Sequence, residues 1–75
     1  MIYPDKYTSF ADWAASLLID FNTQNTIPLE RDEKKWREWG NIVATSPTFV
    51  KAGAPMTQGF ASWRDWAKIV YSNIG

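Results

Sequence analysis

The chain has 75 residues, of which 45% are hydrophobic and 16% aromatic, with eight basic residues, eight acidic residues and no cysteine or histidine. A chain of this length forms one domain, here 1–75, and its small core has to be dense, a need that five tryptophans can meet. The balanced charge disfavours nucleic-acid and membrane-surface partners, which attract through a basic excess, and the lack of cysteine excludes disulfides and thiolate metal sites.

The first helix is predicted over 9–21. Ser9 is placed to cap it, with Asp12 three residues later as a variant of the capping box. The apolar residues that follow have the spacing i, i+3, i+4 and i+7, which aligns side chains along one face of a helix: Phe10, Trp13, Ala14 and Leu17. The longest apolar run, residues 17–19, is too short to span a bilayer, and the N-terminal residues do not have the pattern of a signal peptide, so synthesis in the cytoplasm is expected.

The second helix is predicted over 31–45, beginning between Glu30 and Glu33. The polar residues 22–26 before it indicate a loop, and Pro28 excludes helix in the apolar segment 27–29, which is expected to run extended across the domain. Acidic residues in the first turn of this helix suit the helix dipole.

A short helical turn is predicted over 47–52. Ser46 followed by Pro47 is a helix-start signal, and Gly53 is placed to end the turn. The third main helix is predicted over 60–72, with Thr57 or Ser62 as its cap.

The second and third helices carry near-copies of one octapeptide. Residues 36–43 read WREWGNIV and residues 63–70 read WRDWAKIV, so five of the eight positions are identical, and the first helix is a weaker copy. The shared stripe predicts an all-α fold, a small three-helix bundle in which Trp13, Trp39 and Trp66 meet. The predicted core residues are Phe10, Trp13, Leu17, Trp36, Trp39, Val43, Trp63, Trp66 and Val70.

Two positions within the copies have alternative interpretations. Gly40 stands where the sister helix has Ala67, so it is either a replaceable alanine or a point where a neighbouring group lies against the backbone. Arg37 and Arg64 follow the first tryptophan of each copy at the edge of the stripe. Their heads are expected in water or in an exposed ion pair worth about 0–1 kcal/mol, or else in a specific ion pair with a partner.

The sequence favours a protein without enzymatic activity. Histidine, the commonest general base, and cysteine, the best nucleophile, are both missing. The carboxylates Asp32, Glu33 and Glu38 stand beside Lys34 and Lys35 and predict a solvated face. No catalytic residue, cofactor site or metal site is therefore predicted.

Apolar residues outside the stripes suggest a binding surface. A domain this small has difficulty burying all of them, and exposed apolar clusters often mark interfaces. The predicted partner-binding residues are Ile2, Tyr3, Ile27, Leu29, Phe49, Val50, Met56 and Ile74. Phe49 is expected to be the central one, because aromatic anchors carry much of the energy of an interface.

Three segments resemble short tryptophan-rich proteins of tailed bacteriophages, particularly those of marine cyanobacteria: YTSFADWA at 7–14, WREWGN at 36–41, and GAP at 53–55 ahead of the last helix. The resemblance implies a structural component of the virion, in the capsid, the head–tail junction or the tail, made in the host cytoplasm and bound to other virion proteins in a symmetric assembly. It implies no functional residues. The alternatives are a phage-encoded regulator that binds a host protein and, less favoured, a nucleic-acid-binding module.

Overall fold

The computed structural model describes residues 4–74, apart from the side chain of Ile74. Its α-helices are α1 (Phe10–Asp20), α2 (Trp36–Thr45), α3 (Pro47–Ala52) and α4 (Trp63–Ile74), and two 3-10 turns, η1 (Pro4–Lys6) and η2 (Glu33–Lys35), precede α1 and α2. The described residues contain no strand, which confirms the predicted all-α fold. The predicted short helix over 47–52 is confirmed as α3, which Gly53 ends with a positive φ of 86°.

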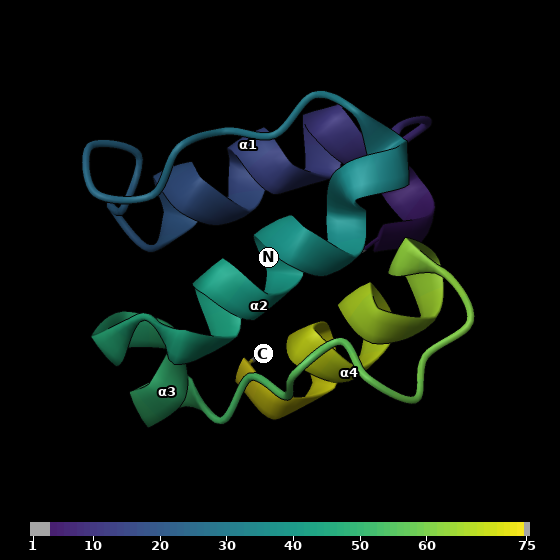
Figure 1. Ribbon diagram of the computed structural model, residues 1–75. Helices are drawn as coiled ribbons and strands as arrows, with labels where there is room; N and C mark the ends of the chain where they lie inside the picture. Colours follow the sequence, from purple (N-terminus) through teal and green to yellow (C-terminus); the bar gives the residue numbers. More distant parts are fainter. Residues whose placement is uncertain (1–3, 75) are drawn as a thin grey trace.

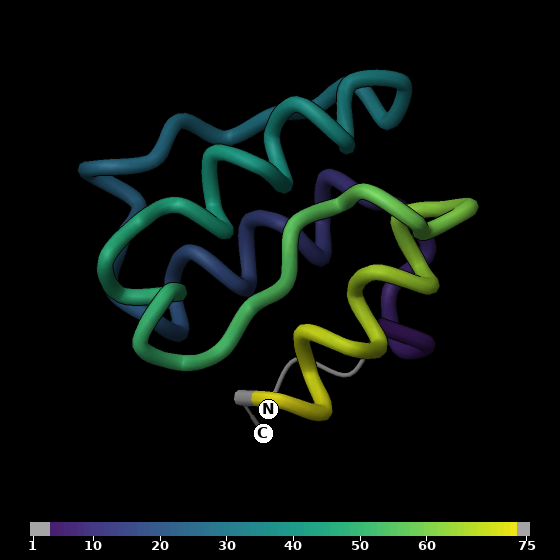
Figure 2. The backbone as a smooth tube through the Cα atoms, turned by 60° about the horizontal axis from the view of Figure 1, so that its bottom comes forward, coloured from purple at the N-terminus to yellow at the C-terminus, as the bar shows by residue number. Residues whose placement is uncertain are grey.

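The three longer helices run in the same direction. In Figures 1 and 2 the first turns of α1, α2 and α4 lie at one end of the molecule, and the chain returns to that end after α1 and again after α3. An 11-residue helix such as α1 is roughly 16 Å long, so each return needs a long connection. Residues 21–32 and 53–62 provide these connections.

Serine caps begin α1 and α4. The Ser9 hydroxyl accepts a hydrogen bond from the Asp12 amide at 3.3 Å, and the Ser62 hydroxyl accepts one from the Asp65 amide at 3.4 Å. The predicted start of the first helix is therefore confirmed, and Ser62 is the cap of the last one. The same offset from serine to aspartate produces the same local geometry in both helices.

The last two long helices begin later than predicted. The Asp32 carboxylate accepts a hydrogen bond from the Lys34 amide at 3.0 Å, which produces the tighter turn η2 before α2 begins at Trp36. Gly59 has a φ of 92°, and residues 60–62 are not helical, so α4 begins at Trp63 directly after its cap Ser62. The alternative cap, Thr57, is instead a buried residue of the connection.

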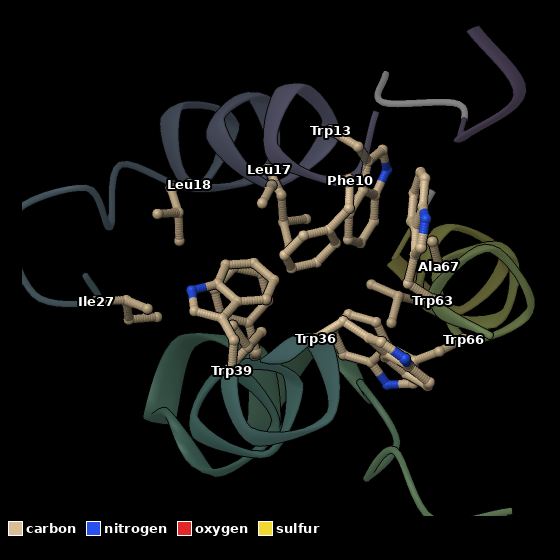
Figure 3. Close-up of a cluster of buried hydrophobic side chains, with 14 residues drawn as sticks. Phe10, Trp13, Leu17, Leu18, Ile27, Trp36, Trp39, Trp63, Trp66 and Ala67 are labelled. Carbon is tan, nitrogen blue, oxygen red and sulfur yellow. The ribbon is translucent and has the colours of Figure 1, made fainter. Parts of the chain in front are cut away.

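All nine predicted core residues are buried, and their aromatic rings form a closed cycle (Figure 3). The first aromatic residue of each long helix contacts the second aromatic residue of the next helix, and the last helix contacts the first. The pairs and their ring-centroid distances are Phe10–Trp39 at 5.4 Å, Trp36–Trp66 at 6.2 Å and Trp63–Trp13 at 5.8 Å.

The prediction that Trp13, Trp39 and Trp66 meet in the core is confirmed. Trp66 lies 5.7 Å from Trp13 and 6.3 Å from Trp39 between ring centroids, in both cases edge to face. Such pairs add about 0.5–1.5 kcal/mol beyond the burial of their area. The core therefore has an approximate threefold order, with one helix contributed by each copy of the sequence pattern.

Two indoles also fix the returning connections. The Trp39 Nε1–H donates to the Pro28 carbonyl at 2.7 Å, and the Trp66 Nε1–H donates to the Pro55 carbonyl at 2.8 Å. In both pairs the proline precedes the tryptophan by 11 residues. The sequence copy thus extends beyond the octapeptide to the segments that lead into α2 and α4.

Candidate functional site

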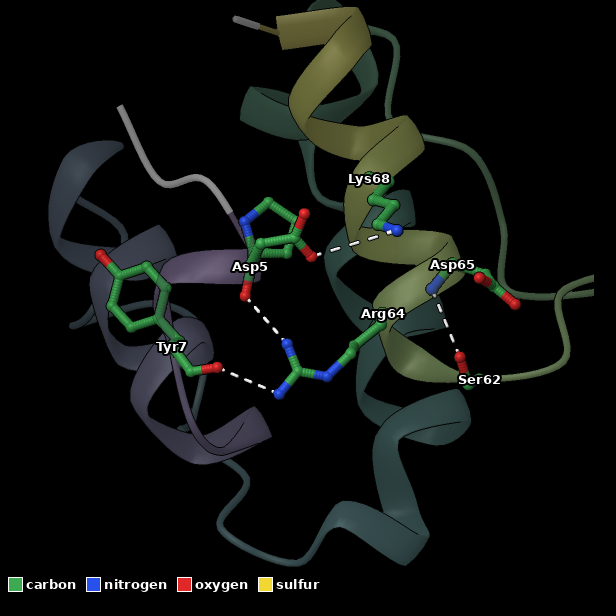
Figure 4. Close-up of polar contacts among 7 residues, drawn as sticks. Asp5, Tyr7, Ser62, Arg64, Asp65 and Lys68 are labelled. Atoms are coloured by element: carbon green, nitrogen blue, oxygen red, sulfur yellow. Dashed lines mark hydrogen bonds and ion pairs between the residues drawn. The ribbon is translucent and has the colours of Figure 1, made fainter.

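Arg37 and Arg64 hold backbone segments of the chain in the same way. The Arg64 guanidinium donates to the Pro4 carbonyl at 3.1 Å and to the Tyr7 carbonyl at 3.0 Å (Figure 4). Its Cζ lies 4.6 Å from the ring centroid of Trp63. One planar guanidinium therefore binds two carbonyls and stacks on the neighbouring indole. We call this arrangement an arginine clamp.

Arg37 forms the second clamp. Its guanidinium donates to the carbonyls of Thr57, at 2.9 Å, and of Phe60, and its Cζ lies 4.7 Å from the ring centroid of Trp36. The backbone carbonyls that both arginine heads bind were not predicted; the Arg37 side chain is nevertheless exposed and that of Arg64 half-buried, and an ion pair with a partner stays a prediction. Sequence spacing cannot reveal these acceptors, because backbone carbonyls carry no residue signature.

Thr57 is packed against Gly40. The Thr57 amide donates to Asn41 Oδ1 at 3.0 Å, and its hydroxyl oxygen lies 2.9 Å from the same atom. A Cβ added to Gly40 would lie 2.3 Å from the Thr57 methyl carbon and 3.3 Å from two ring carbons of Trp66. Of the two interpretations of Gly40, close approach of a neighbouring group is therefore the one that the structure supports.

The predicted partner-binding residues divide into three groups. Leu29, Val50 and Met56 are exposed, with 37%, 57% and 47% of their surface accessible. Ile27 and Phe49 are buried, so the prediction that they are exposed is wrong. Ile2, Tyr3 and the side chain of Ile74 lie outside the described residues.

Local contacts explain the two buried residues. Phe49 is fully buried, and its ring centroid lies 4.9 Å from that of Phe21 at the end of α1. Ile27 is drawn inward by a turn in which its amide donates to the Thr23 carbonyl at 2.9 Å. Phe49 thus closes one end of the core and is not the anchor of an interface.

Three exposed apolar residues were missed by the sequence prediction: Ile19, Ile42 and Ile69. Ile42 and Ile69 occupy the same position of the two octapeptides, one residue before the buried valine, and 48% and 40% of their surfaces are accessible. Their place outside the i, i+3, i+4, i+7 stripe could have identified them. Together with Leu29, Val50 and Met56 they form what we call the exposed apolar set.

A small open pocket of about 270 Å³ lies between η1 and α4, lined by Asp5, Lys68, Tyr71 and Ser72. The Lys68 ammonium is 4.0 Å from the Asp5 carboxylate, and both side chains are more than half exposed (Figure 4). An ion pair of this kind contributes about 0–1 kcal/mol. The pocket is therefore lined by a solvated ion pair together with the side chains of Tyr71 and Ser72.

Residues 4–74 contain no group of three or more acidic, histidine or cysteine side chains that could hold a metal ion. No helix in this part of the chain is long and apolar enough to cross a membrane. Comparison of the chain with protein-family models, with curated proteins and with solved structures finds no match. The exposed apolar set is the candidate binding surface, because large apolar side chains at a protein surface often mark interfaces.

Proposed function

We propose that this protein is a non-enzymatic structural component of a tailed-bacteriophage virion, in the capsid, the head–tail junction or the tail. In this proposal it binds other virion proteins in a symmetric assembly, and it binds neither nucleic acid nor membrane. The phage assignment rests on the resemblance of residues 7–14, 36–41 and 53–55 to small phage proteins. The assignment to protein binding rests on the exposed apolar set.

The observation that carries the proposal is the exposure of large apolar side chains on a domain that buries all five of its tryptophans. Val50, in the short helix α3, and Met56, in the connection between α3 and α4, are both about half exposed. Full burial of an exposed valine or methionine side chain contributes about 1.5–3 kcal/mol, so burial of the exposed half of each contributes about 1 kcal/mol. A few such side chains are enough to add specific affinity to an assembly in which many copies bind at once.

Mass spectrometry of purified particles tests this function. A structural component should be present in a fixed ratio to the major virion proteins after the particles are washed at high salt. Absence from particles, combined with co-purification of a host protein from infected cells, would favour the alternative of a host-directed regulator. Salt-dependent binding to a labelled oligonucleotide would instead favour nucleic-acid binding, for which the chain has no basic excess.

Substitutions in the exposed apolar set test the surface itself. Val50→Asp and Met56→Asp should leave the circular dichroism spectrum and melting temperature nearly unchanged and should reduce incorporation into particles, because they place charge in an apolar contact. Phe49→Asp is the matched control: it buries a carboxylate in the core and should unfold the isolated domain. Normal incorporation of the folded Val50 and Met56 variants would place the partner contact elsewhere.

A further inference from the structure

The two arginine clamps follow the same cyclic order as the aromatic contacts. Arg37 on α2 binds the segment that leads into α4, and Arg64 on α4 binds the segment that leads into α1. In each clamp the accepting carbonyls stand six and three residues before the first aromatic residue of the next helix. We call the contact between one long helix and the segment leading into the next a seam.

The same rule locates a third seam, between α1 and the segment leading into α2. The position after the first aromatic residue of α1 is Ala11, and the carbonyls six and three residues before Trp36 belong to Glu30 and Glu33. A methyl group cannot donate a hydrogen bond or stack as a cation on the ring of Phe10. The α1–α2 seam therefore lacks the residue that forms the clamp at the other two seams.

The segment leading into α2 instead uses hydrogen bonds within itself. The Asp32 amide donates to a Glu30 carboxylate oxygen at 3.1 Å, the Lys34 amide donates to Asp32 Oδ1 at 3.0 Å, and the Lys35 amide donates to the Asp32 carbonyl at 2.9 Å. Such bonds order the segment locally but do not attach it to α1. At the clamped seams, by contrast, the arginine joins residues that are 20 to 60 positions apart in the sequence.

From these contacts we propose that the domain opens at the α1–α2 seam while the other two seams remain closed. Opening there would loosen residues 29–35, whose side chains are largely exposed. It would also uncover more of Leu29 and of the Trp36 ring at the N-terminal end of α2. This conformational device does not depend on the proposed virion function.

Amide hydrogen exchange measured by NMR on the intact chain tests the proposal, because each seam carries a turn hydrogen bond from an amide to the carbonyl three residues earlier. The reporters are the amides of Tyr7, Phe60 and Lys35, which donate to the carbonyls of Pro4, Thr57 and Asp32. The Lys35 amide should have a protection factor lower by on the order of tenfold or more, the effect of one hydrogen bond to a charged group. Equal or greater protection of Lys35 would overturn the proposal.

Substitutions assign the difference to the clamps. Arg37→Lys keeps the charge but loses the forked geometry, so protection of Phe60 should fall towards that of Lys35 while Tyr7 is unchanged. Ala11→Arg should raise protection at residues 33–35 by supplying the third clamp. Ile19→Arg, which adds the same charge at an exposed position of α1, is the control and should have no such effect. A uniform change at all three amides in the Arg37 variant would also overturn the proposal.

Discussion

The helices α2 and α4 contain nearly the same octapeptide, and their differences show what the rest of the chain contributes. Each has a buried tryptophan pair, an arginine that binds two carbonyls, and an indole that donates to a proline 11 residues earlier. They differ at the small residue of the stripe, where α2 has Gly40 and α4 has Ala67. The octapeptide determines the local geometry of each helix. The segment packed against it, which at Gly40 contains Thr57, determines which small residue fits.

The largest expected effect comes from removing a shared tryptophan. A domain of this size has a total stability of roughly 4–11 kcal/mol, and Trp39→Ala or Trp66→Ala should remove about 3–5 kcal/mol of it by opening a large cavity. Urea denaturation followed by circular dichroism measures the loss. A cost below about 1 kcal/mol for either variant would contradict the cyclic aromatic core.

An intermediate effect is expected where the two helices differ. Gly40→Ala should destabilise the domain by about 1–3 kcal/mol, although alanine favours helix, because its methyl group would overlap that of Thr57. Since the Thr57 amide and hydroxyl are both held by Asn41, that methyl group cannot move away freely.

The control for Gly40→Ala is the same change made together with Thr57→Ser, which removes the overlapping methyl group but keeps the hydroxyl. In that background the cost of Gly40→Ala should largely disappear, so the double-mutant cycle isolates the contact. If Gly40→Ala alone stabilises the domain, the segment 55–60 does not lie as close to α2 as the structure shows.

The smaller effects compare two polar contacts of α4 with the segment leading into α1. Arg64→Ala should cost about 1–3 kcal/mol, because it removes two hydrogen bonds from a charged donor. Lys68→Ala, which removes only the exposed pair with Asp5, should cost about 0–1 kcal/mol and less in high salt. Denaturation of both variants at two salt concentrations gives the ranking, and an equal cost for the two would mean that the Arg64 clamp contributes no more than a surface ion pair.

The helices and core could be predicted because their signals lie within a few neighbouring residues. The stripe from Trp36 to Val43, the caps at Ser9 and Ser62 and the helix end at Gly53 each depend on short-range spacing, and each is found in the structure. The exposed positions were predicted less well. Phe49 lies in a short helix with no stripe of its own, so its burial depends on contacts with the core, such as that with Phe21, which is far away in the sequence.

The parallel arrangement and the clamps were not predictable from local pattern. A stripe shows which face of a helix is buried but not the direction in which the neighbouring helix runs. The acceptors of Arg37 and Arg64 are main-chain oxygens, which every residue possesses, so nothing in the sequence distinguishes Pro4 and Tyr7 as their partners. The exposure of Ile42 and Ile69 could have been predicted, since both residues fall outside the stripe.

The contact between Arg64 and Pro4 joins residues 60 positions apart, and this has a consequence for folding during synthesis. At 5–20 residues per second, a ribosome needs roughly 3–12 s to make the 60 residues from Pro4 to Arg64. For roughly 2–9 s of that interval, while residues 21–63 are made, α1 is complete but its aromatic face has no neighbour from α4. During those seconds Phe10 and Trp13 lack their ring contacts with Trp63, so the core cannot close until α4 has been made.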